Sequence, residues 1–166
     1  GGSIATHAAL AQISLTAGIF SSTVTGEKFI PNYGYWCPKK GIYSKIDAKK
    51  YKKGSLILIT FYRSFITASD LSPVKVMINV LEKNGLLVIS SFVPSLKEPQ
   101  SSKWIKEEIE NIQPSAIINA TSFSGKGSDG SSPLDFGNVP VFQVSLSTNK
   151  KKSWKKENRG LSPTDM

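Results

Sequence analysis

Apolar segments of strand length alternate with amphipathic helical segments in the middle of the chain, and this alternation limits the possible folds most strongly. The first apolar run, residues 55–63, is continuous rather than alternating, which is typical of a strand buried on both faces. A helix is predicted over 73–84, where apolar residues recur at helical spacing after Pro73 and before Gly85. A second strand is predicted over 86–93.

The alternation continues with a helix over 102–112 and strands over 116–123 and 139–146. Strands separated by helices of this length require right-handed crossovers and therefore form a parallel sheet with helices on its faces. The predicted fold class is α/β, a small Rossmann-like or flavodoxin-like parallel sheet of about four strands in the order 2-1-3-4. A chain of 166 residues is long enough to bury one such core.

The chain divides into three parts by composition. Residues 1–53 are predicted to be an irregular basic lead-in with a possible N-terminal helix, residues 54–149 the α/β domain, and residues 150–166 a basic C-terminal segment. Within the lead-in, the aromatic side chains of Tyr33, Tyr35 and Trp36 are expected to pack on another part of the molecule.

The net charge of +9 comes from the two flanks, because residues 54–149 hold 7 basic and 8 acidic side chains. Of the 21 basic residues, only two are arginine, the residue type best suited to bidentate recognition of bases and phosphates. Solvated basic flanks are therefore favoured over nucleic-acid binding.

Several classes of site are excluded by the residue counts. Cys37 and His7 are the only cysteine and histidine, so an intramolecular disulfide, a cysteine-rich metal cluster and a two-histidine metal site are all impossible within this chain. No metal ligands are assigned. The sequence contains no uninterrupted apolar window of about 18 residues, so no membrane span is predicted, and a reducing cytoplasm is the expected setting.

Ligands of doubly wound sheets bind outside the carboxyl ends of the strands, so polar residues at those positions are candidate binding residues. Arg63 and Ser64 stand at the end of the first strand, where a cation and a hydroxyl can hold a carboxylate or a phosphate. The alternative, weighted equally, is that Arg63 forms an ion pair with Asp70. Thr121 and Ser122 occupy the corresponding position on the third strand.

Nucleotide binding and nucleophilic catalysis have little support. The Gly/Ser-rich loop 124–132 resembles an anion nest but lacks the spacing of a P-loop, and no glycine lies between the first strand and the first helix. His7 is remote from the strand ends, which leaves only unactivated serines as nucleophiles. The acidic cluster at 107–110 is interpreted as a solvated helix face, and the basic run 150–156 as an exposed turn and short helix.

The chain contains a series of short motifs: Phe61-Tyr62-Arg63-Ser64, Ala68-Ser69-Asp70, Val93-Pro94-Ser95-Leu96-Lys97, Pro114 to Phe123, Val139 to Val144, Trp154 and Arg159 to Asp165. In this order they resemble the family shared by the large subunit of aerobic cobaltochelatase and the magnesium chelatase H subunit. The resemblance covers residues 54–166, with a weaker likeness at 38–47, and is nearer to the cobalt branch. The sequence departs from the family pattern at Phe65, where a histidine is usual, and at Ser69, where a glycine is usual.

The resemblance implies a fragment of a multi-subunit, ATP-dependent chelatase, because members of the family are several times longer. The whole protein would insert cobalt into the corrin precursor hydrogenobyrinic acid a,c-diamide in cobalamin biosynthesis, while AAA+ and von Willebrand A-like partner subunits hydrolyse ATP. The fragment alone is expected to be inactive. Arg63, Ser64, Asp70, Thr121 and Ser122 are the candidate substrate-binding residues. The alternatives are a magnesium chelatase H-type subunit and a non-catalytic Rossmann-like binding or interaction module.

Overall fold

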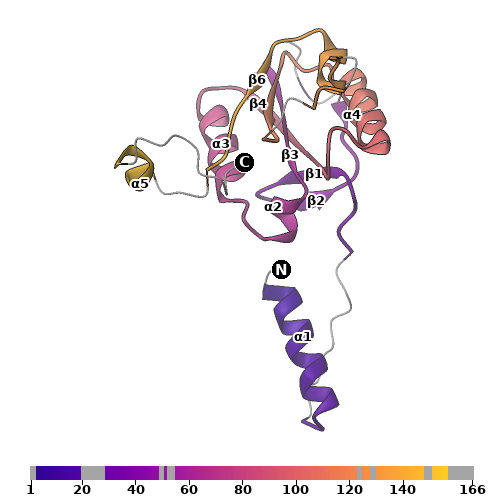
Figure 1. Ribbon diagram of the computed structural model, residues 1–166, viewed down its shortest axis with the longest axis vertical. Coiled ribbons are helices and arrows are strands. Elements are labelled where there is room, and N and C mark those ends of the chain that lie inside the picture. Colours follow the sequence, from indigo (N-terminus) through magenta and orange to yellow (C-terminus); the bar gives the residue numbers. More distant parts are fainter. Residues whose placement is uncertain are drawn as a thin grey trace.

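The computed structural model describes residues 3–19, 29–48, 51, 55–122, 125–127, 130–147 and 151–156 (Figure 1). Its elements follow in chain order: α1 (Ser3–Thr16), β1 (Gly34–Cys37), β2 (Gly41–Tyr43), β3 (Leu56–Tyr62), α2 (Ser64–Thr67), α3 (Ser72–Lys83), β4 (Leu87–Val93), α4 (Pro99–Ile112), β5 (Ala116–Ala120), the 3₁₀ helix η2 (Pro133–Gly137), β6 (Val141–Gln143) and α5 (Lys151–Lys156).

A six-stranded sheet with the order β2-β1-β4-β3-β5-β6 forms the centre of the molecule. The pairs β3–β4, β3–β5 and β5–β6 are all parallel. These four strands are the ones predicted from the sequence, and both their parallel direction and their order are confirmed. β5 and β6 end at Ala120 and Gln143, three residues before the predicted ends at 123 and 146.

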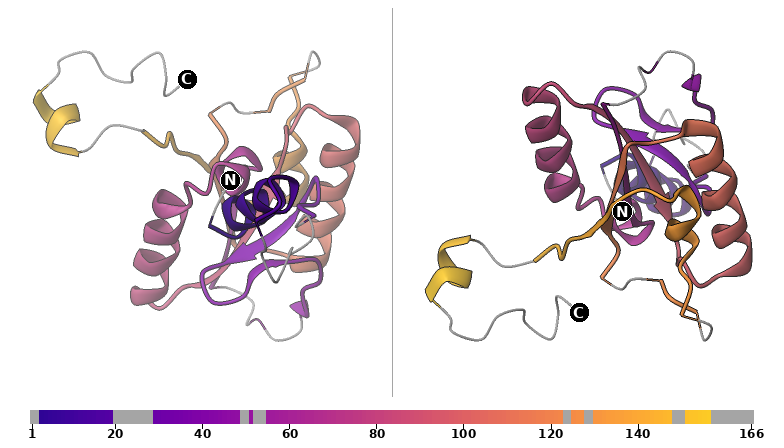
Figure 2. Two further views of the ribbon diagram at one scale, coloured as in Figure 1. Left: turned by 90° about the horizontal axis from the view of Figure 1, so that it is seen from below. Right: turned by 90° about the horizontal axis from the view of Figure 1, so that it is seen from above.

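Helices cover both faces of this sheet, which explains why β3 has a continuous apolar run (Figure 2). Leu58 points toward α4 and η2, whereas Ile59 and Phe61 belong to the cluster on the other side with α2 and α3. All three side chains have 0% exposure. The predicted helices are confirmed, although α4 begins three residues earlier than expected, at Pro99, because proline suits the first turn of a helix.

The prediction of an irregular lead-in is wrong for residues 34–43, which form the antiparallel hairpin β1–β2. β1 pairs antiparallel with β4, and Tyr35 lies opposite Ser91. The expected packing of the aromatic residues is confirmed: Tyr33 stacks on Trp104 with ring centroids 5.1 Å apart, and Trp36 is 8% exposed in the core. These strands are too short to show a periodic pattern, so burial of their aromatic side chains specifies them instead.

The helices at the two ends of the chain lie apart from the sheet (Figure 1). α1 confirms the predicted N-terminal helix, and its Leu10 and Ile13 side chains are exposed. α5 confirms the predicted short basic helix, whereas the motif at 159–165 lies outside the described residues. None of the helices in the described part of the chain is long and apolar enough to cross a bilayer.

The interpretation of the acidic cluster as a solvated helix face is wrong for Glu108. The hydroxyl of Tyr35 donates a hydrogen bond to Glu108 Oε2, and Tyr35 is 1% exposed beneath α4. Glu107 and Glu110 are exposed, as predicted. The hydrogen bond therefore ties the hairpin to α4 across 73 residues of sequence.

Burial of Tyr35, together with the hydrogen bond and negative charge of Glu108, raises the pKa of its phenol well above the ordinary value of 10.0. Above pH 10 the unfolded chain releases this proton and the folded chain keeps it, so the stabilisation is complete below pH 10 and declines as the pH rises. Above pH 10 the free energy of unfolding should fall less steeply with pH in Tyr35→Phe than in wild type, by about 1.4 kcal/mol per pH unit. Urea denaturation at several alkaline pH values measures this slope, and equal slopes in variant and wild type would contradict the prediction.

Candidate functional site

The connections from β3 and from β4 lead to opposite sides of the sheet, so a switch point lies between the neighbouring parallel strands β3 and β5. The carboxyl ends of these two strands are therefore the expected ligand-binding edge of the sheet. From β3 the chain passes through α3 to β4 on one side, and from β4 it crosses through α4 to β5 on the other side. Because Phe61 pairs with Ala120, the next residues, Tyr62 and Thr121, lie side by side at this edge. Doubly wound folds bind their ligands at such switch points.

Arg63 leaves β3 at this edge, and its guanidinium binds the segment that precedes β1. Nε donates to the carbonyl oxygen of Pro31 and Nη2 to that of Ile30, both at 2.8 Å. The described contacts include no ion pair between Arg63 and Asp70, which was one of the two interpretations of this residue. Arginine has five N–H donors, so this anchoring leaves others for a ligand.

Ser64 and Asp70 lie on either side of a single helical turn at the same edge. Ser64 is the first residue of α2 and is exposed. Asp70 is also exposed and follows Ser69, which has a left-handed φ of 58°. This backbone conformation favours glycine, the residue that the resemblance noted in the sequence led us to expect where Ser69 stands.

Thr121 is held at the end of β5 by a closed hydrogen-bond network. Its backbone N–H and its hydroxyl both donate to Oδ1 of Asn119, at 3.1 and 2.7 Å. Asn119 Nδ2 donates to Gln143 Oε1 at 2.8 Å, and Gln143 Nε2 donates to the Thr121 carbonyl oxygen at 2.6 Å. Thr121 is 1% exposed and Asn119 is 0% exposed, whereas the adjacent Ser122 is half-buried.

Tyr62 connects this network to the surface. Its side chain is half-buried and forms a hydrogen bond with Thr121. Burial raises the pKa of the Tyr62 phenol above its ordinary value, and the hydrogen bond with Thr121 partly offsets that effect. The phenol therefore keeps its proton at neutral pH.

A row of polar side chains crosses the sheet at the level of the pair Thr60–Asn119, one residue before the last pair of β3 and β5. The row follows the strand register, in the order Tyr35, Ser91, Thr60, Asn119 and Gln143. Thr60 Oγ1 and Ser91 Oγ lie 3.2 Å apart, and both side chains are 0% exposed. This row was not predicted from the sequence, although polar residues inside strands buried on both faces are the signal that would have revealed it.

The Gly/Ser-rich loop returns toward the same edge at Gly125. This residue is buried with a φ of +67°, and an added Cβ would lie 2.7 Å from the Cβ of Leu96. The Gly127 N–H donates to the Ser131 carbonyl oxygen at 2.9 Å. Ser124, Ser128 and Asp129, which belong to the predicted anion nest, lie outside the described residues.

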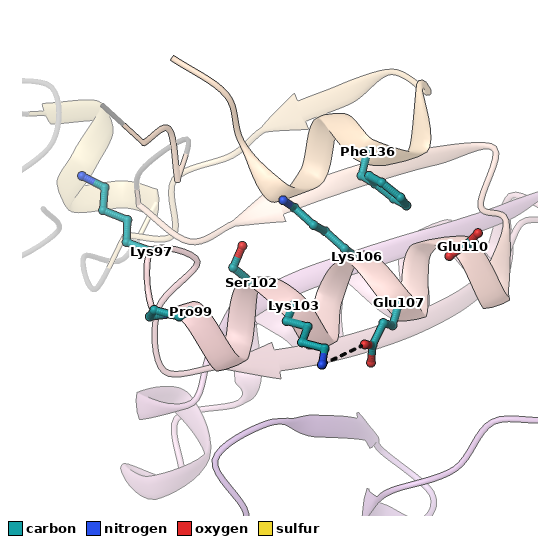
Figure 3. Close-up of a pocket in the computed structure, with 8 residues that line it drawn as sticks. All are labelled: Lys97, Pro99, Ser102, Lys103, Lys106, Glu107, Glu110 and Phe136. Carbon is teal, nitrogen blue, oxygen red and sulfur yellow. Dashed lines mark ion pairs between the residues drawn. The ribbon is translucent and has the colours of Figure 1, made fainter. Parts of the chain in front are cut away.

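Two pockets lie away from the switch point. One, of about 390 Å³, is on the outer surface of α4, where an ion pair of 3.9 Å joins Lys103 to Glu107 (Figure 3). Its three lysines are offset by two glutamates, and it contains no predicted site residue. The second, the hairpin pocket, has a volume of about 430 Å³ and includes Cys37, Tyr43 and Leu87. The described residues contain no group of three or more His, Cys, Asp or Glu side chains arranged to hold a metal.

Fold and site define a doubly wound α/β domain with a hydrogen-bonded polar site at its switch point. The family model described as CobN/Magnesium Chelatase matches residues 7–166, so the chain belongs to the CobN/magnesium chelatase family. This confirms the resemblance found in the sequence and extends it beyond residues 54–166 to nearly the whole chain.

Two relatives and one solved structure are similar to the chain. The aerobic cobaltochelatase subunit CobN of Sinorhizobium sp. is 27% identical over 146 residues, which are 80% of this chain and 12% of that protein. An uncharacterized protein of Methanocaldococcus jannaschii is 30% identical over 125 residues, which are 67% of this chain and 10% of that protein. The solved catalytic subunit of cobaltochelatase from Mycobacterium tuberculosis has the same fold, with a TM-score of 0.70 and 19% identity over 99% of this chain and 14% of that one. The chain thus spans about an eighth of the length of these cobaltochelatase subunits.

Proposed function

We propose that this chain is part of the large, substrate-binding subunit of an ATP-dependent cobaltochelatase. The complete protein inserts cobalt, as a substrate, into hydrogenobyrinic acid a,c-diamide and so forms nitrogen–metal bonds in cobalamin biosynthesis. AAA+ and von Willebrand A-like partner subunits hydrolyse the ATP. The observation that carries this proposal is the family match over residues 7–166 together with a relative named as the aerobic cobaltochelatase subunit CobN.

In this proposal the carboxyl edge of the sheet binds the periphery of the corrin. The remaining N–H groups of Arg63 and the hydroxyl of Ser64 bind a side-chain carboxylate of the ring. Thr121, Ser122 and Asp70 complete the edge around that contact. The anchoring of Arg63 to the carbonyl oxygens of Ile30 and Pro31 supports this role, because a guanidinium held in one orientation loses less side-chain entropy when it binds.

Tetrapyrrole titrations of the full-length subunit test the function. Changes in the absorbance of hydrogenobyrinic acid a,c-diamide and of protoporphyrin IX report binding of a corrin and of a porphyrin. We expect the corrin to bind at least about tenfold more tightly, a difference of about 1.4 kcal/mol. A preference for the porphyrin would support the magnesium chelatase alternative, and binding of neither would support the non-catalytic module.

Arg63→Ala tests the assigned contact in the same titration. Loss of a charge-assisted hydrogen bond is expected to weaken corrin binding by about 1.5–3 kcal/mol. The melting temperature should fall modestly as well, because the contacts with Ile30 and Pro31 are also lost. Unchanged corrin affinity with a lower melting temperature would show that Arg63 only anchors the segment before β1.

A further inference from the structure

Helix α1 exposes large apolar side chains on opposite sides. Its 14 residues include no Lys, Arg, Asp or Glu, whereas the water-facing sides of α3 and α4 carry several charged side chains. Ile13 and Leu15 are two positions apart and therefore point to nearly opposite sides, about 200° around the helix axis. Their side chains are 64% and 53% exposed, and Leu10, on the side of Ile13, is 54% exposed.

A helix with this surface needs packing partners to be stable in water. Helices of fewer than about 15 residues gain most of their stability by packing against other parts of a protein. Because α1 lies apart from the sheet (Figure 1), that packing has to come from outside the residues that the structure describes. Helices that are apolar all round are characteristically buried inside larger proteins.

The surface of α1 fits a protein groove better than a lipid bilayer or a second copy of the chain. Among the described residues no helix is suited to crossing a membrane, and helices that lie on membrane surfaces have a polar face rich in Lys and Arg, which α1 lacks. Two copies that pair as a coiled coil need one apolar stripe along one side of the helix. Because Ile13 and Leu15 lie on opposite sides, only a groove that encloses the helix covers both.

The rest of the large subunit is available to supply such a groove. The family match begins at residue 7, within α1, and the likeness to the solved cobaltochelatase subunit covers 99% of this chain, so α1 belongs to the region shared with these proteins. This chain accounts for only 12% and 14% of the two cobaltochelatase subunits. Most of such a polypeptide therefore lies outside the present residues and can enclose α1.

The position of α1 indicates where this enclosing part lies. Figures 1 and 2 show α1 on the side of the molecule where β3 passes into α2, which is the carboxyl edge of the sheet. Phe29, which is 85% exposed, directly precedes Ile30, whose carbonyl oxygen accepts a hydrogen bond from Arg63 at this edge. Exposed apolar surface is thus present on α1 and next to the candidate site.

We propose that α1 inserts into an apolar groove formed by another part of the same large subunit, and that this part borders the carboxyl edge of the sheet. The proposal rests on the proposed function, because the occupant belongs to the remainder of that subunit. The groove encloses α1 on both sides and is lined by aliphatic side chains without charges, since α1 offers no charged group to pair with them. Insertion of α1 fixes the neighbouring part of the subunit next to the candidate binding edge.

Amide hydrogen exchange of the full-length subunit, followed by mass spectrometry, tests the insertion. The amides of an enclosed α1 should exchange at least about a hundredfold more slowly than those of an unfolded peptide of the same sequence. An exposed helix of this length opens readily in water and gives little protection. Exchange of α1 at the peptide rate in the wild-type subunit would overturn the proposal without the need for any variant.

Two substitutions test whether both sides of α1 are enclosed. Ile13→Lys and Leu15→Lys each place a charge in the groove, on opposite sides, and each should accelerate the exchange of α1 at least about tenfold. Val76→Lys on the outer side of α3 is the matched control, because Val76 is a similarly exposed apolar residue. It should leave the exchange of α1 within about twofold of wild type.

Other results would assign α1 to a different occupant and so contradict the insertion. An effect of only one of the two α1 substitutions would mean contact on one side, and an equal effect of Val76→Lys would mean general destabilisation. Protection that is lost on dilution would point to a second copy, and protection that appears only with anionic phospholipid vesicles would point to a lipid surface. Failure of the wild-type subunit to bind either tetrapyrrole would instead overturn the proposed function, whatever the exchange of α1.

Discussion

Asn119→Ala is expected to lower the free energy of unfolding by about 2–5 kcal/mol. The substitution leaves the N–H and the hydroxyl of Thr121 without their acceptor, and an unsatisfied buried group costs roughly 1–3 kcal/mol. Asn119 is 0% exposed, so water cannot readily replace the lost oxygen. Equilibrium denaturation in urea measures the change.

The matched control is Asn111→Ala on the exposed surface of α4, where Asn111 Nδ2 makes one long contact of 3.4 Å to Glu108. Exposed substitutions of this kind usually change stability by less than about 0.5 kcal/mol. Equal effects of the two substitutions would show that the network beside Thr121 contributes nothing to stability.

Phe61→Ala is expected to destabilise the chain by about 3–5 kcal/mol, because it removes a large side chain from a closely packed core. Phe61 is 0% exposed and contacts the rings of Phe65 and Phe92, with centroid distances of 6.4 and 6.2 Å. Loss of the ring leaves a cavity between the sheet and the helices α2 and α3.

Phe142→Ala provides the comparison, since Phe142 lies on the edge strand β6 with 57% exposure. Its loss is expected to cost less than about 1 kcal/mol, because most of its apolar surface already contacts water. Similar melting temperatures for the two variants would contradict the placement of Phe61 in the core between the sheet and α2 and α3.

Much of the candidate site follows from position along the chain. Arg63, Ser64, Thr121 and Ser122 were predicted because they follow apolar strands, and the structure places them at the switch point between β3 and β5. Tyr62 belonged to the same edge in the sequence, but its hydrogen bond to Thr121 depends on two strands lying side by side. The partners of Arg63 were not predictable, because Ile30 and Pro31 contribute only backbone carbonyls, which every residue carries.

The sequence by itself determined the four parallel strands, their order, the two crossover helices and the membership of the family. These features rest on hydrophobic periodicity and on short motifs, which are properties of neighbouring residues. Only the tertiary structure decided the β1–β2 hairpin, the contact between Tyr35 and Glu108, and the network of Asn119, Thr121 and Gln143. Each of these depends on packing: the hairpin exists because β4 offers an edge, and the polar groups are satisfied because the fold brings together residues 22 to 73 positions apart.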